Sequence, residues 1–231
     1  MCGDSRRLQL TTIRNVTHIN PSPLNTMFIS FEGIDGSGKS TQLTMLRTWM
    51  EEKGYRVVTV REPGATMLSE AIREILLSNK QSITSTAELL LFSAARTQLV
   101  EKVIVPALES GSVVLCDRFV DSTTAYQGYG REIDLDQVML CNQLATRQVM
   151  PSVTYFIDVP YEEAQLRMHF HPSGSEPDRM EKSGRAFFER VRSGYQAIAQ
   201  QEPDRFVVVN GVQNREAIHS EIVRHIENRL I

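Results

Sequence analysis

One segment of the sequence has the spacing G-x-x-x-x-G-K-[ST]: Gly33-Ile34-Asp35-Gly36-Ser37-Gly38-Lys39-Ser40. In such a loop the glycines let backbone N–H groups approach phosphate oxygens closely, and the start of the following helix adds partial positive charge. The spacing predicts that Lys39 reaches the β- and γ-phosphates of a nucleoside triphosphate and that the Ser40 hydroxyl binds Mg²⁺. An apolar run precedes the segment and a helical pattern follows it, as this loop requires.

A second segment that could bind phosphate and metal is the charged pair Asp117 and Arg118, which follows the apolar run 112–116. Nucleotide-binding enzymes with a phosphate loop keep an acid in this position to hold Mg²⁺ or its water. Both residues would lie at the carboxyl edge of a parallel sheet, where ligands bind in such folds. The sequence therefore predicts one residue for the metal and its neighbour for phosphate. A guanine-reading Asn-Lys-x-Asp motif is missing, since the segment 79–82 lacks the acid, which argues against a GTPase.

Short apolar runs alternate with longer segments of helical period, a pattern typical of an α/β fold with a parallel sheet covered by helices in three layers. We expect about five strands, at 27–31, 56–60, 112–116, 153–159 and 206–209. The expected helices are 39–53, 68–78, 86–109, 134–148, 160–170, 184–201 and 214–229.

Two segments lack these patterns. Residues 1–26 show neither strand alternation nor a helical stripe, so we expect a disordered N-terminal extension before a catalytic domain at 27–231. The stretch of about 171–183 is rich in Pro, Gly and Ser and is expected to form a mobile lid.

Composition excludes several classes of protein. The 231 residues carry a net charge of -3, which is unlike a dedicated nucleic-acid-binding protein, and no window is apolar enough to span a membrane. Three widely spaced cysteines, Cys2, Cys116 and Cys141, give neither a disulfide framework nor a zinc cluster. These features favour a single-domain cytoplasmic protein.

Beyond these patterns, the chain from Met27 to about Asn210 resembles the thymidylate kinases, which phosphorylate dTMP to dTDP with ATP. The matching segments are 31–41, 61–64, 91–96, 117–119, 122–123, 125–128 and 178–179. The resemblance implies a three-layer P-loop kinase fold with a lid, ATP and dTMP as substrates, Mg²⁺ as cofactor, a place in dTTP synthesis and a homodimer formed by packed helices.

The resemblance also assigns roles to residues. It implies that Phe92 stacks on thymine, that Arg96 donates to a thymine carbonyl, and that Tyr126 crowds the place of a 2′-hydroxyl. The implied dTMP set is Asp35, Glu62, Arg73, Phe92, Arg96, Arg118, Thr123, Tyr126 and Gln127. The implied ATP set is Gly33, Ile34, Asp35, Gly36, Ser37, Gly38, Lys39, Ser40, Thr41 and Arg167. The catalytic set is Lys39, Asp117, Arg118 and Arg179, with Ser40 and Asp117 at the metal.

The sequence departs from the family at the catalytic cation. Some members carry an arginine inside the phosphate loop, where this chain has Gly36, so the lid is expected to supply the charge. Arg179 is the first candidate and Arg167 the second, while His169 and His171 stand where related sequences often have arginines.

Two functions other than a thymidylate kinase are also compatible with a phosphate loop. Another P-loop kinase, acting on a small metabolite or a different nucleoside monophosphate, is disfavoured by Phe92, Arg96 and Gln127. A non-catalytic ATP-dependent switch is disfavoured because the residues expected to act on phosphate and metal are intact.

Overall fold

The computed structural model describes residues 27–170 and 178–230. The expected N-terminal extension, residues 171–177 of the expected lid, and with them His171, lie outside the described residues. Within these ranges no helix has both the length and the apolar character needed to cross a membrane.

Five parallel strands form one sheet in the order β2-β3-β1-β4-β5. Their bounds are β1 (Phe28–Glu32), β2 (Val57–Arg61), β3 (Val113–Asp117), β4 (Val153–Asp158) and β5 (Phe206–Asn210). The strands are short and rich in Val, Ile and Phe, residues that fit a pleated, buried surface. Because β1 is central and all five of its residues are buried, the loop that follows it starts in the middle of the carboxyl edge.

Helices cover both faces of the sheet. Their bounds are α1 (Lys39–Glu52), α2 (Met67–Leu77), α3 (Ser85–Leu99), the π-helical η1 (Val100–Ile104), α4 (Val105–Glu109), α5 (Val120–Thr123), the π-helical η2 (Thr124–Gly130), α6 (Leu135–Thr146), α7 (Tyr161–Phe170), the 3₁₀ turn η3 (Glu181–Ser183), α8 (Arg185–Gln201) and α9 (Arg215–Leu230).

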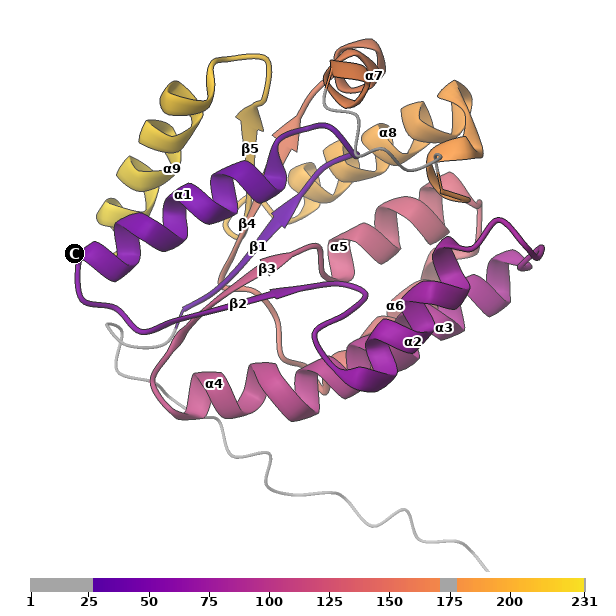
Figure 1. Cartoon of the computed structure of the whole chain (residues 1–231), viewed down its shortest axis with the longest axis horizontal. Helices are drawn as coiled ribbons and strands as arrows, with labels where there is room; N and C mark the ends of the chain where they lie inside the picture. Colours follow the sequence, from indigo (N-terminus) through magenta and orange to yellow (C-terminus); the bar gives the residue numbers. More distant parts are fainter. Residues whose placement is uncertain (1–26, 171–177, 231) are drawn as a thin grey trace, which may run out of the picture.

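Alternate strand residues serve different layers, as the two-residue period of a strand requires. Ile29 and Phe31 of β1 pack under α1 and α9, whereas Phe28 packs on the opposite face with η1 and α4. Figure 1 shows α1 and α9 side by side on one face of the sheet, with α4 and α8 on the other. The predicted three-layer α/β fold is therefore confirmed.

Two helical predictions need correction. The single helix expected at 86–109 consists of α3, the π-helical turn η1 and α4 in succession. The segment 120–130 was not expected to be helical, because its Gly, Tyr and Gln residues give no apolar stripe. The structure forms α5 and then η2 there. A π-helical turn adds a residue to the turn, and such turns are frequent at functional sites.

Candidate active site

A cavity of about 820 Å³ opens at the carboxyl edge of the sheet. It is lined by residues of the phosphate loop and α1 (35–42), by Arg61 and Glu62 at the end of β2, by Arg73 of α2, by Asp117 and Arg118 at the end of β3, by Arg167 and Met168 of α7, and by residues 213–216 and Ile218 at the start of α9. Except for Gly33 and Ile34, every residue of the predicted ATP set lines it. The β5–α9 connection was missed by sequence reasoning. Its position after the last strand, at the carboxyl edge where ligands bind, is the one feature of the sequence that could have indicated that it lines the cavity.

The phosphate loop leaves polar groups ready for an anion. The residue before α1 is Gly38, with φ 99°, and no side chain caps the helix. The first N–H groups of α1 are therefore not satisfied by a capping side chain. The buried Ser37 hydroxyl also has no hydrogen-bond partner among the described residues. Unpaired donors at a helix N-terminus form a ready anion site.

Lys39 lies inside this loop rather than in solvent, since only 6% of it is exposed. Its Nζ donates to the carbonyl of Ile34 at 3.0 Å and lies 4.0 Å from Asp35 Oδ1. Burial and the neighbouring Arg118 guanidinium lower the pKa of Lys39 from its ordinary value. Because this ammonium is poorly hydrated, a phosphate that enters the loop would interact with it more strongly than with a lysine in solvent.

The Ser40 hydroxyl donates to Asp117 Oδ2 at 2.6 Å, joining the loop to the end of β3. A hydroxyl and a carboxylate are hard oxygen ligands of the kind Mg²⁺ prefers, and Mg²⁺ commonly takes its remaining ligands from water and nucleotide phosphates. In the described ranges no group of three or more His, Cys, Asp or Glu side chains could hold a metal ion. The donor set thus fits a metal that is carried in with a nucleotide.

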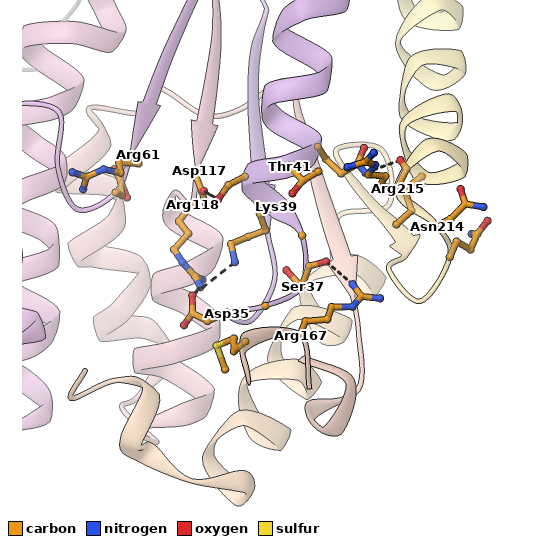
Figure 2. A pocket seen from close by; sticks show the side chains of 18 of the residues that line it. Asp35, Ser37, Lys39, Thr41, Arg61, Asp117, Arg118, Arg167, Asn214 and Arg215 are labelled. Carbon is orange, nitrogen blue, oxygen red and sulfur yellow. Dashed lines mark hydrogen bonds and ion pairs between the residues drawn. The ribbon is translucent and has the colours of Figure 1, made fainter. Parts of the chain in front are cut away.

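Arg118 stands between the loop and β3 with its backbone in the left-handed region, φ 71°. Non-glycine residues rarely adopt this conformation, and it persists only where the surroundings fix it. The Arg118 N–H donates to Phe31 O at 3.0 Å, and its carbonyl accepts from the Cys116 thiol at 2.9 Å. The guanidinium reaches Asp35 Oδ1 at 2.6 Å. Figure 2 shows Lys39 and Arg118 both directed at Asp35.

These two cations set the charge of Asp35. Burial disfavours the charged carboxylate, but the Arg118 and Lys39 charges outweigh it and lower the pKa of Asp35 below its usual value. Asp35 is therefore an anion placed between two cations.

Glu32, which sequence reasoning missed, stabilises the turn that contains Arg118 by accepting hydrogen bonds from residues that follow Arg118. Its carboxylate is fully buried and accepts from the Phe119 N–H at 2.7 Å, the Ser122 hydroxyl at 2.6 Å and the Tyr195 hydroxyl at 2.8 Å. Burial, reinforced by the negative charge of Asp121, raises the pKa of Glu32 to about 7. Only its place at the end of the central strand could have singled it out.

Helix α7 packs directly on the phosphate loop. Gly36 has φ 79°, and a Cβ there would strike the Ala164 carbonyl and lie 3.0 Å from Met168 Cγ. From the same helix, Arg167 donates to Ser37 O at 3.3 Å and to Gly211 O at 2.8 Å. Figure 2 shows Arg167 reaching the loop at Ser37, on the side away from Arg118. A side chain at position 36 is thus excluded by the helix that brings in Arg167.

A second, smaller cavity of about 90 Å³ adjoins the first. Asp35, Glu62, Arg73 and Arg118 line both. All the residues of the predicted dTMP set line the smaller cavity, together with Pro63, Leu77, Ser122, Asp178 and Met180. The structure thus brings together members of the predicted dTMP set that are far apart in the sequence, from Asp35 to Gln127.

Arg96 enters this cavity from α3, held by buried partners. Its Nη2 lies 2.6 Å from Glu62 Oε2 and also donates to Phe119 O, while its Nη1 donates to Asn142 Oδ1 at 2.9 Å. Phe92, one turn earlier, packs against α2 and lines the same cavity. Neither Asn142 nor the Glu62–Arg96 pair was expected from the sequence.

Arg179, the first candidate for the lid cation, lines neither cavity. Its Nη1 pairs with Glu88 Oε2 at 2.6 Å and its Nε donates to Leu76 O at 2.9 Å. It borders a separate groove with Lys80 and Arg131. In this structure Arg179 therefore ties the end of the expected lid to α2 and α3, while Arg167 lies at the phosphate loop.

Comparison with known proteins agrees with this geometry. Residues 31–222 match the family model described as thymidylate kinase. The thymidylate kinase of Prosthecochloris aestuarii is 49% identical over 209 residues, covering 88% of this chain and 94% of that protein. The thymidylate kinase of Chlorobaculum parvum is 48% identical over 207 residues, covering 87% and 95%. The crystal structure of the Ehrlichia chaffeensis thymidylate kinase superposes with a TM-score of 0.71 at 38% identity, covering 87% of this chain and 99% of that one. A phosphate loop, an adjoining cavity with the residues of a nucleotide-binding set, and relatives of this closeness over most of the chain together mean that the protein belongs to the thymidylate kinase family of phosphotransferases.

Proposed function

We propose that this enzyme transfers the γ-phosphoryl group of ATP to dTMP and so forms dTDP, within dTTP synthesis. The observation that carries the proposal is the junction of the two cavities at Asp35, Arg73 and Arg118. A triphosphate on the phosphate loop and a nucleoside monophosphate in the smaller cavity would meet there. A single nucleotide-binding switch has no need for the second cavity.

The reaction needs charge compensation more than proton transfer. The acceptor is already a phosphate anion, so no general base has to make it nucleophilic. Two unit charges about 4 Å apart repel by roughly 4 kcal/mol at an effective dielectric near 20. The cations Lys39, Arg118 and Arg167 around the larger cavity offset this repulsion and stabilise the charge that spreads over the transferred group.

Arg167 takes the role for which Arg179 was the first candidate. Both arginines are paired with a glutamate, Arg167 with Glu163 and Arg179 with Glu88, but Arg167 lines the larger cavity and contacts the loop at Ser37, whereas Arg179 lines neither cavity. Because Gly36 cannot supply a side chain, the phosphate loop itself has only Lys39 as a cation.

The proposal includes Mg²⁺ bound through Ser40 and Asp117 together with the nucleotide phosphates. The 2.6 Å contact between their side chains supports this donor pair. When bound, the ion would neutralise phosphate charge and orient the phosphates.

The smaller cavity is proposed to hold the thymidine part of dTMP. Phe92 offers an aromatic face, Arg96 a fixed donor, and Asp35 a carboxylate for a sugar hydroxyl. The Thr123 hydroxyl is buried with no hydrogen-bond partner among the described residues, as expected of a group that awaits a ligand. The Arg118 guanidinium lies over the ring of Tyr126, with its Cζ 5.0 Å from the ring centroid. Tyr126 is proposed to crowd the place of a 2′-hydroxyl.

We also propose a homodimer in the cytoplasm. Helix α3 packs against both α2 and α6 (Figure 1). Leu90 of α3 and Leu140 and Leu144 of α6 are exposed, Leu144 by 79%. Burying them against a second copy would remove this apolar surface from water. Light scattering of the wild type should give twice the chain mass, and Leu144→Glu should shift it toward one chain. A monomeric wild type would contradict the dimer.

The function is tested by an acceptor screen. With ATP and Mg²⁺, ADP release should require an acceptor and be fastest with dTMP, compared with dUMP, dCMP, GMP and AMP. Equal rates with dCMP or GMP would overturn the substrate assignment. ADP release that no monophosphate stimulates would favour a switch instead.

A further inference from the structure

Glu88, in the first turn of α3, is a fully buried acid that the proposed reaction does not use. Its Oε1 accepts from Gln127 Nε2 at 2.8 Å and from Arg131 Nε at 3.1 Å. Its Oε2 lies 2.6 Å from Arg179 Nη1. One carboxylate thus serves side chains from η2, from the residue after it and from the end of the expected lid.

The two guanidinium groups determine what Glu88 offers to Gln127. Beside two permanent cations Glu88 is a carboxylate, which only accepts hydrogen bonds. The Gln127 atom that faces it must therefore be the amide nitrogen. With its nitrogen on Glu88, the Gln127 side chain, which is only 1% exposed, carries its carbonyl oxygen Oε1 on the other branch of the amide. Since Gln127 lines the smaller cavity, the structure leaves this carbonyl oxygen for a ligand there.

An acceptor at Gln127 and a donor at Arg96 distinguish the pyrimidines. Thymine and uracil carry an N3–H donor beside the O4 acceptor. Cytosine has the reverse pattern, an N3 lone pair beside an N4 amino donor. The Arg96 guanidinium has only N–H donors, and its contact with Glu62 fixes their orientation. The cavity wall therefore matches the edge of thymine and opposes like groups to the edge of cytosine.

We infer that Glu88 is a positioning residue for base selectivity: by binding the Gln127 amide nitrogen, it fixes the Gln127 carbonyl as an acceptor and so favours thymine over cytosine. This inference rests on the proposed function, because it requires the base of the acceptor to lie in the smaller cavity. A purely structural role, in which Glu88 only neutralises Arg131 and Arg179, predicts no effect on base selectivity.

The main test is Glu88→Gln, with kcat/KM measured for dTMP, dUMP and dCMP, and with the inhibition constant of dCMP against dTMP. A glutamine at 88 can donate or accept, so the Gln127 amide is free to turn over. We expect the dTMP to dCMP ratio to fall at least about tenfold, the size of one mispaired hydrogen bond. The dTMP to dUMP ratio should not change, because both bases share the same edge. An unchanged dTMP to dCMP ratio would overturn the inference.

A second variant keeps the test decisive if Glu88→Gln does not fold. Gln127→Leu removes the carbonyl and leaves Glu88 with both arginines, so the dTMP to dCMP ratio should fall in the same way. If Gln127→Leu preserves the ratio, the inference is wrong. Arg131→Lys is the matched control, since it keeps a cation beside Glu88 and does not touch Gln127. A shift in the ratio as large as that of Glu88→Gln would attribute the effect to the surrounding segment instead.

The wild type separates this inference from the proposed function. If the unaltered enzyme shows no preference for dTMP over dCMP, the proposed function fails. If it prefers dTMP and the preference survives in both variants, only the role of Glu88 fails.

Discussion

The two adjoining cavities are built in different ways. The larger, of about 820 Å³, is built around one continuous stretch, residues 35–42, and offers backbone N–H groups with a few cations. The smaller, of about 90 Å³, is lined by side chains that are spread along the chain from Asp35 to Met180. Phosphates require backbone N–H groups close to their oxygens and nearby positive charge, whereas a base requires donors and acceptors at fixed positions.

Three polar groups of the smaller cavity are held by buried acids. Glu62 holds Arg96, Glu88 holds Gln127, and Glu32 holds the turn that carries Arg118. In the phosphate loop of the larger cavity, by contrast, the donors are backbone N–H groups, whose positions are set by the loop and the start of α1. Under the proposed function, base selectivity therefore depends on residues that lie behind those in contact with the ligand, whereas phosphate binding depends on the loop itself.

The largest effect is expected at the larger cavity. Lys39→Ala should lower kcat by about a thousandfold, the upper end of the cost of removing one transition-state donor. Circular dichroism should show an intact fold, and the KM for dTMP should change little. Lys53→Ala, at the other end of α1, is the control and should leave kcat unchanged. Normal turnover in Lys39→Ala would remove the phosphate loop from the chemistry.

The second prediction separates Arg167 from Arg179. Arg167→Ala should lower kcat by about a hundredfold, a discounted value for an arginine that stabilises phosphoryl transfer. Arg179→Ala should leave kcat within about threefold, because Arg179 is engaged with Glu88 and Leu76. Steady-state kinetics of both variants with ATP and dTMP check this. The opposite ranking would return the catalytic role to Arg179.

The third prediction concerns the smaller cavity alone. Phe92→Ala should raise the KM for dTMP about tenfold, within the roughly 1 to 3 kcal/mol that stacking on one base is worth. The KM for ATP should stay the same. Phe92→Leu retains apolar bulk against α2 but has no aromatic face, so it should behave like Phe92→Ala. If Phe92→Leu binds dTMP normally, packing rather than stacking matters.

The smallest effect is one of stability at the buried layer. The pKa of Glu32 is raised from 4.5 to about 7 in the folded protein, so the folded state binds this proton more tightly than the unfolded state. Its contribution to stability is complete below about pH 4.5 and is lost as the pH rises through about 7. Glu32→Gln removes this loss.

Thermal unfolding from pH 5 to pH 8 checks the sign. The Tm of wild type should fall relative to that of Glu32→Gln as the pH rises. The exposed Glu52→Gln should follow the wild type at every pH. A constant difference between wild type and Glu32→Gln would mean that Glu32 has the same pKa in both states.

Sequence reasoning predicted the fold and the phosphate loop well for one physical reason. Strand alternation, helical period and the glycine spacing of residues 33–40 are local patterns, which can be recognised in the sequence without knowledge of the fold. The segment 120–130 was missed because its π-helical turn has no apolar stripe of its own and is stabilised by packing against α8.

The candidate site was predicted unevenly for the same reason. The dTMP set came from a resemblance and not from any local rule, since its members converge only in the fold. The buried acids Glu32 and Glu88 carry no pattern that separates them from surface glutamates, and only burial reveals them. The partner of Arg179 could not be predicted because it depends on how the chain after 177 meets α3.

The close contact between Gly36 and α7 restricts how this enzyme can change. An arginine at position 36 would collide with the backbone of Ala164, so it could be accommodated only if α7 moved off the loop. That movement would withdraw Arg167 from the same loop. The two ways of supplying a cation are therefore incompatible while α7 keeps the position seen in this structure. Exchanging one for the other requires the packing of α7 on the loop to change together with position 36.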